Sequence, residues 1–151
     1  MNIEYMELAI QEAIKASEID EVPIGCVIVK DGEIISKAHN LRHTTKRSIA
    51  HAEIIAIDEA CSKLNSWYLD ECDIYITLEP CPMCAGAIMQ SRIKNVFFGA
   101  YDFKGGSYGS NFNLNEIKGL NHYPNVVGGI LEEKCSSLLK DYFKLKRNKQ
   151  I

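Results

Sequence analysis

The chain has 151 residues, of which 46% are hydrophobic and 25% charged, and its formal net charge at pH 7 is −3. This composition predicts one globular domain, residues 1–151, and argues against a protein that binds nucleic acid through overall positive charge. The lack of a membrane-length apolar run and of a positively charged leader predicts a protein of the reducing cytoplasm, with no membrane partner and with six free cysteines.

The first quarter of the chain predicts a helix followed by a β-hairpin. Residues 2–19 carry apolar side chains at helical spacing. Residues 22–29 are apolar and rich in β-branched side chains, which is typical of a strand. Asp31-Gly32 is a common tight-turn sequence, so residues 33–38 are predicted to return as a second, antiparallel strand.

Strands and helices then alternate. A polar and basic loop is expected at residues 40–49, followed by a helix at 50–64 and a buried strand at 73–78. A second helix is predicted at 82–92, because Pro82 suits a first helical turn, and another strand at 93–99.

The last third predicts a long loop, a strand and a helix. Residues 101–124 are rich in Gly and Asn, 126–130 form a short apolar run, and 131–147 have helical character. The alternation of elements predicts an α/β fold: a three-layer α-β-α sandwich around a mixed five-stranded sheet.

Two short motifs carry the chemistry, H-x-E at residues 51–53 and P-C-x-x-C at 80–84. The imidazole of His51 and the thiols of Cys81 and Cys84 are zinc ligands by type, and three protein ligands leave the fourth tetrahedral position open, as in catalytic sites. The combined spacing is typical of zinc-dependent nucleobase deaminases. We therefore expect these three residues to bind zinc and Glu53 to act as the catalytic proton carrier.

The local structure expected for these residues agrees with those roles, except for one angle. Cys81 and Cys84 lie one turn apart at a helix start, where thiolates are stabilised. Glu53 follows His51 by roughly 200° around an ideal helix. Only a loop start or a distorted first turn would aim both side chains at one point.

Other readings of the same residues are open. A lone C-x-x-C is often redox-active or half of a structural zinc site, although the first reading leaves H-x-E unexplained and the second lacks a fourth ligand. Residues 140–150, with five basic side chains and one acidic, fit either a phosphate-binding patch or a solvated helix end. The remaining cysteines are expected to be core or surface thiols: Cys26, Cys61, Cys72 and Cys135.

The chain resembles the cytidine/deoxycytidylate deaminase superfamily and, within it, the bacterial tRNA-specific adenosine deaminases. The resemblance runs from the first predicted helix to the last. It is carried by Glu21-Val22-Pro23-Ile24-Gly25, Asn40, Ala50-His51-Ala52-Glu53-Ile54, residues 75–80, 83–88, 91–93 and 98–100, Asp102, and residues 109–110, 121–122, 129–131 and 142–147.

This resemblance implies a cytidine-deaminase-like fold and a zinc-dependent homodimer, with one zinc ion per subunit, that converts adenosine to inosine at the wobble position of a tRNA anticodon stem-loop. The Leu78-Glu79-Pro80 segment would line the base pocket, and one set of residues would hold the flipped base: Val22, Ile24, Asn40 and Ala52. A second would contact flanking nucleotides: Asp102, Lys104, Asn121 and His122. A third would meet phosphates: Lys144, Lys146 and Arg147.

The chain also departs from the family pattern. Many members have Asp-Pro-Thr or Asp-Ala-Thr where this chain has Arg47-Ser48-Ile49, and Arg where it has Tyr101. Val22 and Ile24 fit core packing as well as base contact. The alternative functions are a free nucleobase or nucleoside deaminase of guanine or cytosine type, and an inactive RNA-binding protein, against which Glu53 argues.

Overall fold

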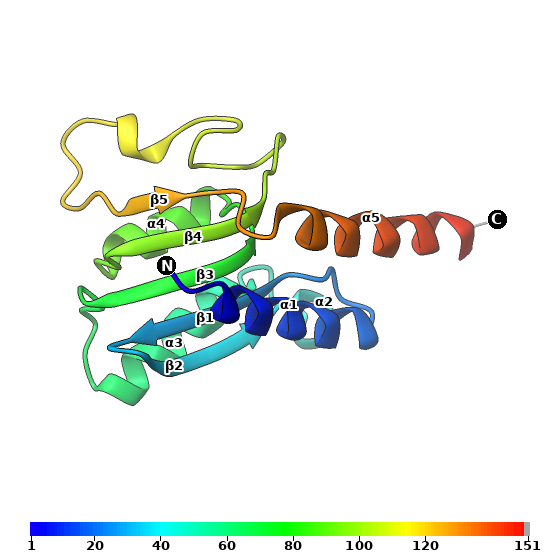
Figure 1. Ribbon diagram of the computed structural model, residues 1–151, viewed down its shortest axis with the longest axis horizontal. Coiled ribbons are helices and arrows are strands. Elements are labelled where there is room, and N and C mark those ends of the chain that lie inside the picture. The colour runs from blue at the N-terminus through cyan, green and yellow to red at the C-terminus, as the bar shows by residue number, and fades with distance from the viewer. Residues whose placement is uncertain (150–151) are drawn as a thin grey trace.

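A computed structural model describes residues 1–149; the last two residues of the predicted domain, Gln150 and Ile151, lie outside the described part. Five strands form one sheet in the order β2-β1-β3-β4-β5 (Figure 1). The strands are β1 Gly25–Lys30, β2 Glu33–His39, β3 Cys72–Leu78, β4 Asn95–Ala100 and β5 Asn125–Val127. The helices are α1 Ile3–Glu18, α2 Arg42–Thr45, α3 Ala52–Leu64, α4 Pro82–Gln90, the 3₁₀-helix η1 Leu114–Glu116, and α5 Glu132–Lys149.

The sheet is mixed, as predicted. Strand β1 pairs antiparallel with both β2 and β3, whereas β3, β4 and β5 run parallel. The Asp31-Gly32 turn has positive φ at both residues, 50° and 76°, which suits the tight connection between β1 and β2. The crossovers between the parallel strands follow the chain through α4 and through the long β4–β5 connection.

Helices cover both faces of the sheet, so the predicted three-layer sandwich is confirmed (Figure 1). On one face, Met6 and Ala9 of α1 pack with Tyr75 and Phe97, together with Cys135 of α5. On the other face, side chains of α3 and α4 pack on a separate apolar cluster that includes Ile28, Ile74 and Ile76. Helix α1 approaches the sheet closely at Gly25, where a Cβ atom would lie 1.9 Å from the carbonyl oxygen of Ala9.

Most element ends differ from the predictions by one to three residues, and two differences have a clear physical cause. The expected loop at 40–49 contains the short helix α2, because the buried carboxylate of Glu21 accepts hydrogen bonds from the backbone N–H groups of His43 and Thr44. Strand β5 ends at Val127 instead of residue 130, because Gly128 packs against the Phe98 ring and Gly129 has a φ of 84°.

All six cysteines are free thiols, as expected. None of the helices within residues 1–149 has the length and apolar character needed to cross a membrane.

Candidate active site

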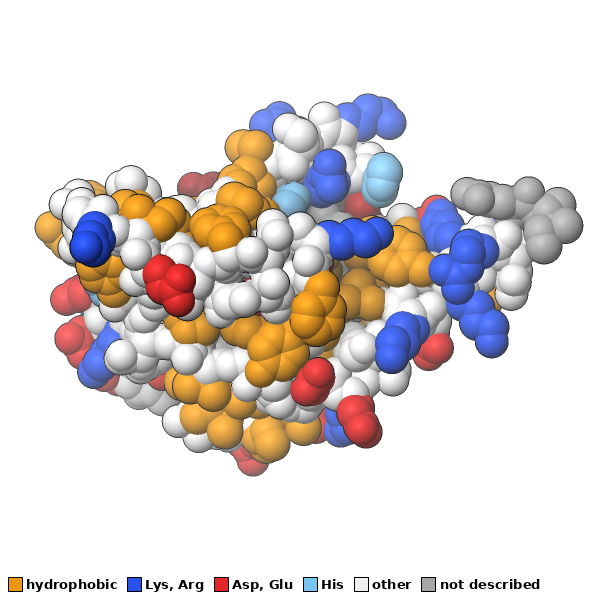
Figure 2. Space-filling view, turned by 90° about the horizontal axis from the view of Figure 1, so that it is seen from above, with side chains coloured by type: hydrophobic (Ala, Val, Ile, Leu, Met, Phe, Trp, Pro, Cys, Tyr) orange, Lys and Arg blue, Asp and Glu red, His pale blue; other side chains and the backbone are white. Residues whose placement is uncertain are grey.

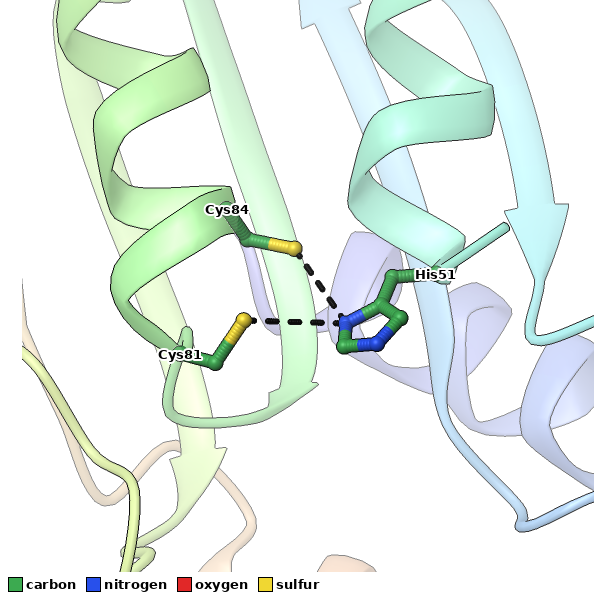
Figure 3. Close-up of side chains that lie close together, drawn as sticks. All are labelled: His51, Cys81 and Cys84. Carbon is green, nitrogen blue, oxygen red and sulfur yellow. Dashed lines mark hydrogen bonds between the residues drawn. The ribbon is translucent and has the colours of Figure 1, made fainter. Parts of the chain in front are cut away.

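Three potential metal ligands converge at the N-terminal ends of two neighbouring helices. His51 is the N-cap of α3, Cys81 is the N-cap of α4, and Cys84 lies in the first turn of α4. Figure 3 shows both thiols pointing at the His51 ring, and Nδ1 lies 3.6 Å from Cys81 Sγ and 3.5 Å from Cys84 Sγ. The donor atoms all lie within 4.8 Å of one another.

These separations fit zinc. A tetrahedral ion with Zn–S bonds of about 2.3 Å and Zn–N bonds of about 2.05 Å places the nitrogen about 3.6 Å from each sulfur. The observed distances match that value. The donor set, one imidazole and two thiols, favours zinc over hard cations such as magnesium or calcium. Residues His51, Cys81 and Cys84 therefore fit the metal that the sequence implies.

One of the two thiols, Cys81, is already polarised toward metal binding, whereas a hydrogen bond with Cys81 and burial raise the pKa of Cys84. Hydrogen bonds from Cys84 and then from His51 lower the pKa of Cys81 to about 4. The same contact with Cys81 raises the pKa of His51. A thiolate at a helix N-terminus beside an imidazole is the ionisation state that a metal ion takes up.

Glu53 is buried beside this cluster. Its side chain is 4% exposed, and burial raises the pKa of the carboxyl group to about 7. The angle that conflicted with an ideal helix is resolved by the backbone, because His51 lies outside the helix with extended torsions, φ −74° and ψ 151°. Helix α3 begins at Ala52, so both side chains can approach the same point.

A pocket opens beside His51. Its lining includes all four residues expected to hold the base: Val22, Ile24, Asn40 and Ala52. Their position is established, whereas their contact with a base stays a prediction. Within the chain, the Asn40 side chain accepts a hydrogen bond from the Arg42 amide and donates one to the Val22 carbonyl.

Sequence reasoning missed Arg42, which also lines this pocket. Its position in the basic 40–49 segment was the only available signal. The resemblance placed Glu21 in a family block and Glu79 in a pocket-lining segment, but it did not foresee that both carboxylates are buried, at 0% and 2% exposed; the lining of this pocket does not include Glu79. Acidic side chains are almost never fully buried, so the sequence offered no signal for the burial of these two.

The residues expected to contact flanking nucleotides lie in two separate places. Asp102 and Lys104 follow β4 at the sheet edge where Cys81 follows β3. In contrast, His122 Nε2 lies 2.6 Å from the carbonyl oxygen of Ile93. Ile93 precedes the first residue of β4, so His122 lies at the other end of this strand from Asp102 and Lys104. Within one chain, Asn121 and His122 are therefore not brought to the pocket.

The basic side chains gather at the C-terminal end of α5 (Figure 2). Lys144 and Arg147 are exposed, whereas Lys146 Nζ lies 2.6 Å from a carboxylate oxygen of Asp20. A groove lined by Tyr142 and Lys146, among others, shares Val22 with the pocket. The pocket and the basic end of α5 are thus connected across the surface.

Comparison with known proteins places the chain in a family. The model of the cytidine and deoxycytidylate deaminase zinc-binding region matches residues 1–100. The chain is 54% identical over 146 residues to the tRNA-specific adenosine deaminase of Bacillus subtilis (strain 168), and the match covers 97% of this chain and 91% of that protein. The chain belongs to the tRNA-specific adenosine deaminase family.

Solved structures agree with this assignment. A structure from a study of A-to-I editing by tRNA:A34 deaminases at the wobble position of transfer RNA has a TM-score of 0.86 and 40% identity, covering 91% of this chain and 100% of that one. A guanine deaminase from Bacillus subtilis has a TM-score of 0.64 and 32% identity, covering 78% and 87%. Both the sequence and the fold are more similar to the tRNA:A34 deaminase.

The interaction of Glu21 with α2 predicts a pH-dependent loss of stability. Burial opposes ionisation, but hydrogen bonds from Thr44 and His43 hold the pKa of Glu21 below its usual value. A lowered pKa in the folded state gives stability that is present above the unfolded-state pKa and lost as pH falls through the folded value. Glu21→Gln is therefore expected to cost about 1–3 kcal/mol at pH 7 and less as the pH falls below about 4.

Denaturant unfolding of both proteins between pH 7 and pH 3 checks this expectation. The difference in denaturant midpoint between wild type and Glu21→Gln should become smaller as the pH falls. A difference in midpoint that stays constant over this range would show that the Glu21 charge does not stabilise α2. The exposed Glu59→Gln serves as the control and should show no difference in midpoint.

Proposed function

We propose that this protein is a zinc-dependent hydrolase that converts adenosine to inosine at the wobble position of a tRNA anticodon stem-loop. The observation that carries the proposal is the convergence of His51, Cys81 and Cys84 near buried Glu53, beside a pocket that His51 helps to line. The similarity to a named tRNA-specific adenosine deaminase over nearly the whole chain supports the RNA substrate.

The reaction needs one activated water and one proton carrier. His51, Cys81 and Cys84 would hold one zinc ion per subunit, which would act as a Lewis acid and lower the pKa of water from about 15.7 to about 7. Glu53 removes the proton from the attacking water and gives it to the ring nitrogen of adenine. Glu53 then takes the remaining proton from the new hydroxyl on C6 and passes it to the exocyclic amine, so that the C6–N bond breaks, ammonia leaves and the C6 carbonyl of inosine remains.

The pocket residues orient the base for this reaction. Asn40 offers an amide for hydrogen bonding, while Val22, Ile24 and Ala52 provide apolar walls. Proteins read RNA sequence mainly in single-stranded loops, whose bases can be splayed into such pockets. Asp102 and Lys104 would then contact the nucleotides next to the adenosine, at the same edge of the sheet.

We also propose a homodimer of single-domain subunits in the cytoplasm. Large apolar side chains are exposed on the β4–β5 connection, including Phe103 at 79%, and such surfaces usually mark a protein interface. Because Asn121 and His122 lie away from their own pocket, we expect them to meet RNA held by the other subunit. Sedimentation velocity should give twice the monomer mass.

The basic end of α5 is expected to bind RNA phosphates. The double variant Lys144→Gln/Arg147→Gln removes two exposed charges and leaves Lys146 with Asp20. It should raise KM for the stem-loop several-fold. It should also reduce the slope of log KM against log salt concentration by about 1.4. Steady-state kinetics at several salt concentrations measure both effects. Lys63→Gln, at the far end of α3, is the control, and an unchanged slope in the double variant would refute phosphate binding there.

A free-base deaminase is the second candidate, because the Bacillus subtilis guanine deaminase has the same fold at 32% identity. Ammonia release distinguishes the two functions. The protein should release ammonia from an anticodon stem-loop with adenosine at the wobble position, and not from guanine, cytosine or cytidine. Release from a free base, without release from the stem-loop, would favour the second candidate.

A further inference from the structure

The side chain of Glu79 ties one loop to the segment that carries the metal ligands. Glu79 follows the last residue of β3 and precedes Pro80-Cys81. Its oxygen Oε1 accepts hydrogen bonds from the Asp102 amide, at 3.1 Å, and from the Ser110 hydroxyl. Its oxygen Oε2 accepts from the amides of Tyr108 and Ser110, both at 3.1 Å. All four donors belong to one loop, residues 102–110.

This carboxylate is buried without a cation. It is 2% exposed, and the ion pairs found within residues 1–149 do not involve it. A buried charge is tolerated only when hydrogen bonds replace its lost hydration, and here the four loop donors do so. The loop passes directly over the carboxylate, since a Cβ on Gly106 would lie 2.4 Å from Glu79 Oε1. Residue 106 must therefore be glycine for this contact to form.

The loop is also fastened to the metal-ligand segment itself. The Ser107 amide donates to the Pro80 carbonyl at 2.9 Å, and the Tyr108 hydroxyl donates to the Ala85 carbonyl in α4. At the other end of the loop, the Asp102 carboxylate accepts from the amides of Lys104 and Gly105. Glu79 thus fixes Asp102, and Asp102 in turn orders the backbone that carries Lys104.

We propose that Glu79 is a positioning residue for the RNA substrate. Its carboxylate holds the 102–110 loop at a set place relative to Cys81 and Cys84, so that the loop contacts the nucleotides flanking the adenosine in the pocket. Glu79 acts through the loop and touches neither the base nor the metal. This inference rests on the proposed function, because it assigns the loop to the same stem-loop substrate.

The variant Glu79→Gln tests the inference with little change in size. A glutamine side chain has one oxygen, so its NH₂ group must face N–H donors that the carboxylate had satisfied. The loop should then lose its fixed position while Cys81 and Cys84 keep theirs. We expect the Kd and KM for the stem-loop to rise at least tenfold, kcat to change less than threefold, and zinc content to stay at the wild-type level.

The measurements are fluorescence anisotropy with a labelled stem-loop, steady-state kinetics and metal analysis. Glu116→Gln is the matched control, because Glu116 is exposed on the same β4–β5 connection. A Kd within twofold of wild type would overturn the inference, and so would a fall in kcat with unchanged Kd. A loss of zinc in proportion to activity would also overturn it, by showing that Glu79 only supports the metal site.

A milder variant keeps the test decisive if Glu79→Gln does not fold. Ser110→Ala removes only the hydroxyl donor to Glu79 and should weaken stem-loop binding about threefold, whereas unchanged binding would overturn the inference. Failure of the proposed function is recognised separately. In that case the wild-type protein would neither bind nor deaminate the stem-loop, whatever the behaviour of the variants.

Discussion

Glu53→Gln is expected to reduce inosine formation by about 10²–10⁴-fold while zinc content and fold are retained. The amide has nearly the same shape as the carboxyl group but cannot carry a proton from the attacking water to the base. The residue is 4% exposed, so the substitution should leave the surface unchanged. Inosine is measured by mass spectrometry of digested RNA, and zinc by metal analysis of the same sample.

The control for this variant is Glu59→Gln. Glu59 lies on the same helix, α3, but is exposed. It should keep full activity. If Glu53→Gln lost its zinc, or if it retained more than a tenth of the wild-type rate, Glu53 would not be the proton carrier.

Cys84→Ala is expected to abolish both zinc binding and deamination. Cys84 Sγ lies 3.5 Å from His51 Nδ1, and its removal leaves two of the three protein ligands. Zinc bound only to the folded state stabilises it by mass action, so the variant should also have a lower Tm than the zinc-loaded wild type. Chelator-treated wild type should show the same lower Tm and recover activity when zinc is added.

The matched variant is Cys61→Ala, which removes a half-buried thiol from α3 outside the ligand set. It should keep its zinc and its activity. A Cys84→Ala protein with the wild-type zinc content would show that the metal is held elsewhere. Recovery of chelator-treated protein without added zinc would show that the reaction does not depend on the metal.

Local patterns were enough to predict most of the fold. The Asp31-Gly32 turn predicted the antiparallel hairpin, and the alternation of strands and helices predicted the layers, because each signal depends on neighbouring residues. Helix α2 could not be predicted, since its first N–H groups are satisfied by Glu21, about twenty residues earlier in the chain. The early end of β5 depends on contact between Gly128 and the Phe98 ring, which sequence spacing does not reveal.

The same distinction applies to the site. The H-x-E and C-x-x-C spacings predicted which three donors would meet, because each motif lies at a helix start. The direction of Glu53 depends on the extended backbone of His51, which is the loop start that the sequence left open as one of two possibilities. The positions of His122 and Glu79 depend on contacts across the sheet with Ile93 and with the 102–110 loop, so they became visible only in the structure.

The most direct test of the whole account is a position-resolved map of inosine in one RNA. A stem-loop with adenosine at the wobble position and at other loop positions is incubated with zinc-loaded protein, and its fragments are identified by mass spectrometry. The account predicts inosine at the wobble position alone, and none with Glu53→Gln. An unmodified stem-loop, with guanine or cytosine deaminated in parallel reactions, would contradict it.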